Sequence, residues 1–200
     1  MPEAVLPFDC INIETLTLTA RPVQRKQNVD EYWVHDIFAD VPAQRSKFTT
    51  FPFEFALDDV VMSRPPIKKG QKMVASFAVQ LGTPQYDFMK ALDGRLKQLM
   101  SNTLTNDERD ETNWGQIMDM TCDDGNIVVH LPFNSWGQPA LPLFKRGSNE
   151  RLSVHHLTQG QRLRASLSIS YLYCIHPAES KNRTGKYQCG AMVTIKNAES

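Results

Sequence analysis

Two stretches near the carboxyl end decide the fold: GQRLRASLSISYLYCI at residues 160–175 and YQCGAMVTI at residues 187–195. From Leu163 to Ile175 every second residue is apolar or aromatic, and arginine or serine fills the alternate positions as far as Ser170. The second stretch alternates in the same way. Such alternation predicts strands with one buried and one polar face. We therefore expect a long antiparallel hairpin with an extended basic loop between its strands.

The same pattern recurs further upstream. Apolar and aromatic residues alternate, or cluster with β-branched ones, in five more stretches that are short enough to be strands. These predicted strands cover residues 11–18, 32–38, 51–55, 73–81 and 127–131. The 73–81 stretch shows the cleanest alternation of the five.

One helix is predicted, over residues 84–100. Thr83 can cap its first turn, Pro84 suits the first helical position, and Asp87 complements the helix dipole. Apolar residues then recur at three- and four-residue steps, which is typical of a helix with one face on a core.

These elements predict a single domain over residues 1–200 that is mainly β. An OB-like antiparallel barrel with one inserted α-helix suits the number of strands and the helix that interrupts them. Alternating strand–helix units are absent, so a doubly wound sheet is not expected. A jelly-roll-like sandwich is the alternative.

Composition indicates a globular protein of an intracellular compartment. The chain has 22 basic and 22 acidic residues, so its net charge is zero. It shows neither a secretory signal nor an apolar run long enough to cross a membrane, and we expect no membrane partner. The four cysteines are scattered without a CxxC pair, which indicates reduced thiols. We expect location in a cytoplasm or nucleus, that of the host if the chain is viral, and no secretion.

No catalytic constellation is apparent. The phosphate-binding loops GxxxxGK[ST] and GxGxxG and the GxSxG nucleophile motif are absent. Cys174, His176 and Cys189 could approach one another, but zinc needs a fourth ligand that is not evident. Two acidic groups, Asp58-Asp59 and Asp119 with Asp123-Asp124, are expected in loops, which do not hold metals rigidly. We therefore predict no catalytic residue, no metal, no cofactor and no enzymatic activity, with a metal-dependent nuclease as a minor alternative.

Basic residues are grouped, and aromatic residues lie near them in the sequence. A backbone of phosphates needs positive charges along a groove, with rings on which bases can stack. Tyr171, Tyr173 and Tyr187 share the apolar register of their strands, so they could equally belong to the core. The predicted nucleic-acid-binding residues are Arg64, Lys68, Lys69, Lys72, Trp136, Lys145, Arg146, Arg162, Arg164, Tyr173, Lys181, Arg183 and Lys186.

A resemblance to a known family supports this expectation. The matching residues are Phe88, Leu92-Asp93, Leu96 and Trp114, then Leu157, Gly160-Gln161, the stretch 163–175, and Gly185 ahead of 187–195. This pattern, over roughly 110 residues, resembles the OB-fold single-stranded DNA-binding proteins of large DNA viruses and some phages. Two features depart from it: Gly115 stands where an aromatic residue often follows the tryptophan, and the last residues, Asn197 to Ser200, are not an acidic tail.

The resemblance implies protection of single strands during DNA replication or recombination. The expected partner is single-stranded nucleic acid, and a homo-oligomer is compatible with the sequence. The alternative function is a virion structural or assembly protein, built on a β-sandwich, that oligomerises through a hairpin edge and has no affinity for nucleic acid.

Overall fold

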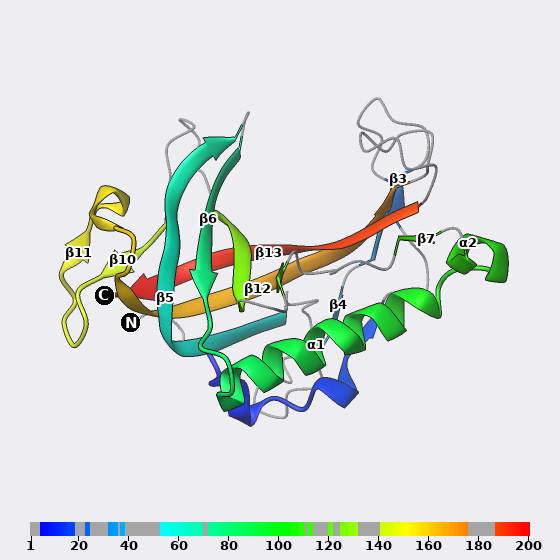
Figure 1. Ribbon diagram of the computed structural model, residues 1–200, viewed down its shortest axis with the longest axis horizontal. Helices are drawn as coiled ribbons and strands as arrows, with labels where there is room; N and C mark the ends of the chain where they lie inside the picture. The colour runs from blue at the N-terminus through cyan, green and yellow to red at the C-terminus, as the bar shows by residue number, and fades with distance from the viewer. Residues whose placement is uncertain are drawn as a thin grey trace, which may run out of the picture.

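The computed structural model describes residues 5–18, 23–24, 32–35, 37–38, 53–69, 72–110, 112–113, 120–121, 125–131, 141–175 and 187–200. In this part of the chain five strands form a closed barrel (Figure 1). They are β5 (Phe53–Lys69), β6 (Lys72–Ala78), β9 (Asn126–Leu131), β12 (Arg162–Ile175) and β13 (Tyr187–Glu199).

The strand order confirms the predicted OB-like barrel with an inserted helix. β5 pairs with β6 and β12, β6 pairs with β9, and β12 pairs with β13, all antiparallel. The barrel closes where Thr194 of β13 lies beside His130 of β9, and this last pairing is parallel. The barrel is therefore mixed, whereas the sequence suggested wholly antiparallel pairing. The predicted hairpin of residues 160–195 is the pair β12–β13.

Short strands extend or flank the barrel. At one edge β13 continues to β10 (Leu143–Phe144) and β11 (Arg151–Leu152), and at the other β12 continues to β3 (Tyr32–His35) and β2 (Val23–Gln24). β7 (Thr112–Asn113) lies beside β13, and β8 (Met120–Thr121) lies beside β9. β1 (Thr17–Leu18) and β4 (Ile37–Phe38) pair only with each other.

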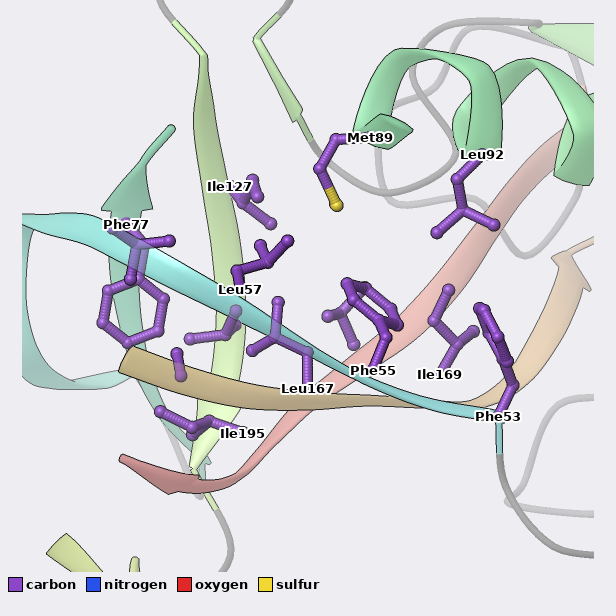
Figure 2. Packing of buried hydrophobic residues seen from close by; sticks show 14 of the residues in the cluster. Phe53, Phe55, Leu57, Phe77, Met89, Leu92, Ile127, Leu167, Ile169 and Ile195 are labelled. Atoms are coloured by element: carbon purple, nitrogen blue, oxygen red, sulfur yellow. The ribbon is translucent and has the colours of Figure 1, made fainter. Parts of the chain in front are cut away.

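Helix α1 (Pro84–Ser101) completes the hydrophobic core. It begins as predicted: the Thr83 side chain accepts a hydrogen bond from the backbone N–H of Tyr86. Its buried side is formed by Met89, Leu92, Leu96 and Met100. Figure 2 shows Met89 and Leu92 pointing from the helix toward side chains of the barrel interior. No helix among the described residues has the length and apolar character needed to cross a bilayer.

A β-bulge in β5 forms a corner of the barrel. The first half of this strand pairs with β12 and the second half with β6. Within the half that pairs with β12, Asp58 and Asp59 together face one residue, Arg164, and Asp59 has a φ of 58°. A bulge bends a strand and increases its twist, and Figure 1 shows β5 turning sharply between its two halves. The expectation that Asp58-Asp59 lies in a loop was wrong.

A second bulge lies in β12 and reverses which side chains are buried. Ser170 and Tyr171 of β12 together face one residue, Met192 of β13. Before the bulge, Leu167 and Ile169 point into the core; after it, Leu172 and Cys174 do, and all four are fully buried. Because side chains alternate along a strand, Tyr171 and Tyr173 lie on the face opposite the core.

Two strand predictions fail in part. Within residues 11–18 the chain forms a 3-10 turn, Ile13–Thr15, in which the Asn12 side chain accepts a hydrogen bond from the backbone N–H of Glu14. The strand expected over 73–81 ends at Ala78, and Leu81 is exposed. The chain also forms a short helix that the sequence did not predict, α2 (Asn106–Asp110).

Candidate nucleic-acid interface

The hairpin formed by β6 and the second half of β5 carries four of the predicted cations. We call residues 64–69 and 72–76 the β5–β6 arm. Arg64 and Lys68 are exposed, and the register sets Lys69 opposite Lys72 at the tip. No acidic side chain of the described chain forms an ion pair with Arg64 or Lys68. Within the described chain, the arm therefore presents positive charge that no acidic side chain pairs with.

The arm continues the outer face of the barrel. Arg64 lies opposite Ser76, and Ile67 lies opposite Val74. Val74 in turn lies beside His130 of β9, and His130 beside Thr194 of β13. The residues adjacent to these in β6 and β9 point into the core, so Ile67, Val74, His130 and Thr194 form one row on the outer face.

Ile67 was not among the predicted site residues. Its side chain is 42% exposed, although it lies between the two exposed cations of the arm. The sequence offered a weak signal, an isoleucine between Pro66 and Lys68, which reads equally well as a core position of the strand. An exposed apolar side chain amid cations suits contact with the face of a nucleobase.

Arg162 and Arg164 lie on the outer face of β12 at the barrel corner, and both have acidic partners. Arg162 Nη1 is 3.4 Å from Asp59 Oδ2, and Arg164 Nε is 3.1 Å from Asp58 Oδ1. The four side chains are well exposed, so each pair contributes little to stability. Their main effect is electrostatic, since two carboxylates offset two guanidinium groups at this corner.

Lys145 and Arg146 follow β10 in the turn that leads to β11. Both are exposed, and Lys145 Nζ lies 3.5 Å from Glu150 Oε2. The pairing of Phe144 with Glu199, and of Glu199 with Arg164, brings this turn to the end of the sheet where β12 begins. The structure thus groups Lys145, Arg146, Arg162 and Arg164 in one region, where three of the four cations are ion-paired.

The Tyr173 side chain lies over the neighbouring strand, β13. Its register partner is Gly190 of β13, and a Cβ atom at position 190 would overlap the Tyr173 ring. The ring therefore packs on a glycine backbone, on the face of the sheet away from the core. Tyr173 is half-buried, so the β12 bulge excludes the full burial that its sequence register allowed.

The predicted site residues do not all meet at one place. Nine positions along β12 separate Arg164 from Tyr173, a span of about 30 Å in an extended strand. Trp136, Lys181, Arg183 and Lys186 lie outside the described residues, as do the side chains of Lys69 and Lys72. Lys181, Arg183 and Lys186 nonetheless fall in the chain segment that joins β12 to β13.

Metal-binding groups are not found in the part of the chain that the structure describes. No cluster of three or more His, Cys, Asp or Glu side chains occurs there. Cys174 and Cys189 do lie together, as their register predicts, whereas His176 and the pair Asp123-Asp124 lie outside the described residues. The acidic pair Asp58-Asp59 binds arginines in the corner described above.

Comparison with known proteins adds no relative. No protein-family model matches this sequence, and a search of curated proteins finds no similar chain.

Proposed function

We propose that this protein is a non-enzymatic binder of single-stranded DNA that acts in replication or recombination. The proposal includes the resemblance to the OB-fold single-strand binders of large DNA viruses and phages, and location in a reducing, intracellular compartment. Phosphates contact the cations of the β5–β6 arm, and bases stack on exposed apolar and aromatic side chains.

The strand order of the barrel supports the proposal most directly. OB barrels bind oligonucleotides on the face of their second and third strands, and with the loops that follow the first and the fourth strand. Here those strands are β6 and β9, and the loops are the tip of the β5–β6 arm and the segment between β12 and β13. Seven predicted cations fall on these two hairpins: Arg64, Lys68, Lys69, Lys72, Lys181, Arg183 and Lys186.

The ion pairs at the barrel corner refine which cations are expected to bind. A cation that already has a carboxylate partner must lose that contact before it serves a phosphate. Arg162, Arg164 and Lys145 are of this kind. Arg64 and Lys68 form no ion pair with a carboxylate of the described residues. The proposal therefore centres on the arm and assigns the corner a minor part.

The test compares two variants with matched loss of charge. The arm variant carries Arg64→Gln, Lys68→Gln and Lys72→Gln, and the corner variant carries Arg162→Gln, Arg164→Gln and Lys145→Gln. Fluorescence anisotropy of labelled oligo(dT) is measured at several salt concentrations. The arm variant should bind at least about tenfold more weakly and with a salt slope reduced by about two, since each phosphate contact in a single strand adds about 0.7.

The corner variant should stay within about threefold of the unmodified protein, because its cations are already neutralised. The proposal is wrong if the unmodified protein does not bind, or if its affinity is independent of salt. Equal losses in both variants would overturn the assignment to the arm. Light scattering of the protein with and without oligonucleotide then reports assembly without DNA, the behaviour of a structural protein.

A further inference from the structure

Two free cysteines face each other across the β12–β13 hairpin. Cys174 and Cys189 are direct register partners, and their Sγ atoms are 3.4 Å apart, with the Cys189 thiol donating a hydrogen bond to Cys174. Direct partners in antiparallel strands have Cα atoms about 4.5–5.5 Å apart, within the range that a disulfide spans. The backbone geometry therefore allows a disulfide once an oxidant is supplied and the two sulfur atoms move closer together.

The two thiols differ in access. Cys174 has no exposed surface and belongs to the hydrophobic core, whereas Cys189 is only half-buried. Hydrogen bonding with the Cys189 side chain, together with burial, raises the pKa of the Cys174 thiol. Cys174 therefore stays protonated and shielded, and a reagent from solvent reaches Cys189 first.

We propose that Cys174 and Cys189 form a modification site that a low-molecular-weight disulfide closes into an intramolecular disulfide bond. The thiolate of Cys189 attacks the reagent RSSR, which forms a mixed disulfide and releases one thiolate RS⁻. Cys174 then loses its proton to solvent and attacks the Cys189 sulfur, which releases the second RS⁻. In sum, two protein thiols and one RSSR give one protein disulfide and two RSH.

The disulfide would link β12 to β13 close to both ends of the segment that contains Lys181, Arg183 and Lys186. It would also lie next to the Tyr173–Gly190 pair, on the adjacent rung of the same two strands. The redox state of the two cysteines would thus decide whether a covalent bond joins the two strands that flank this basic segment. The chemistry of the pair does not depend on nucleic-acid binding, so either proposal can fail while the other stands.

The test uses a chain in which Cys10 and Cys122 are replaced by serine, so that only this pair remains. The protein is incubated with oxidised glutathione, alkylated under denaturing conditions and weighed by mass spectrometry. We expect a product that lacks two hydrogens, carries no glutathione and cannot be alkylated. A product that keeps one glutathione while Cys174 is still open to alkylation would overturn the proposal, as would a protein that does not react.

Two single-cysteine variants assign the order of events. Cys174→Ser leaves the accessible thiol and should accumulate one glutathione, because no second thiol can displace it. Cys189→Ser leaves the buried thiol and should react at least about tenfold more slowly than Cys174→Ser. The reverse order of reactivity would contradict the mechanism. Circular dichroism confirms that each variant is folded before the reaction, and the alanine variant at the same position replaces any serine variant that is not.

Discussion

The two ends of strand β12 make different kinds of contact. At its start, Arg162 and Arg164 form ion pairs with aspartates of β5 across an open, hydrated surface. At its end, Tyr173 and Cys174 lie against Gly190 and Cys189 of β13. Each contact is made at or beside a bulge. The first end is neutralised, and the second combines an aromatic ring with two thiols, one buried and one half-buried.

This difference shows that the position of a charged residue in the sequence says little about whether that residue already has an ion-pair partner. Arg162 and Arg64 are both exposed arginines on the outer face of the same barrel. A bulge in the neighbouring strand places a carboxylate within 4 Å of Arg162, whereas Arg64 has no such partner in the described chain. The bulges, rather than the composition, decide which cations are free to act.

The largest expected effect tests the bulge that reverses the buried face of β12. Leu172→Ala should lower the free energy of unfolding by about 2–5 kcal/mol, because Leu172 is fully buried and its truncation leaves a cavity. Tyr171→Ala, one position earlier, should cost less, since Tyr171 is on the opposite face and half-buried. Urea unfolding of both variants gives the comparison. A larger loss for Tyr171→Ala would mean that the alternation continues unbroken through Ser170.

A smaller effect is expected where Tyr173 crosses β13. Gly190→Ala places a methyl group against the ring, which must move away, and we expect a loss of about 1–3 kcal/mol in thermal or urea unfolding. The matched control is Gly94→Ala in α1, where the added methyl meets no atom within 4 Å and should stabilise the helix by up to about 1 kcal/mol.

A double-mutant cycle sharpens this prediction. If Gly190→Ala acts through the ring, it should cost much less in a Tyr173→Ala background, with a coupling of at least about 0.5 kcal/mol. Strictly additive losses would show that the ring and the glycine do not contact each other in solution.

The smallest effect on stability is expected at the neutralised end. Asp58→Asn with Asp59→Asn should change the free energy of unfolding by less than about 1 kcal/mol per exposed pair. The same variant frees Arg162 and Arg164, so its affinity for labelled oligo(dT) should rise about two- to fivefold at low salt. The control, Asp107→Asn with Asp110→Asn in α2, removes the same charge elsewhere on the exposed surface. An equal rise in both would point to net charge alone.

Much of the fold could be predicted because the signals were local. The cap formed by Thr83 and the strand indicated by the alternation of 163–175 depend on neighbours in the sequence, and both elements occur where expected. Residues 11–18 failed because the apolar spacing there fits a strand, while the hydrogen bond from Glu14 to Asn12 favours a turn.

The parts of the site that were missed depend on register between distant strands. From Tyr171 to Ile175 every residue is apolar or aromatic, so either face could be the buried one, and only the bulge against Met192 decides. In the same way, the partners of Arg162 and Arg164 lie more than a hundred residues earlier in the chain. No local pattern could pair them.

The adjacent prolines of β5 affect whether copies of this protein associate through strand edges. Pro65 and Pro66 lie in the part of the strand that has β6 as its one neighbour in the described sheet. A strand with an open side invites a further strand from another molecule, and proline removes the amide hydrogens that such an addition requires. An edge that is unpaired in the described sheet can thus persist without recruiting copies of this protein into a growing sheet.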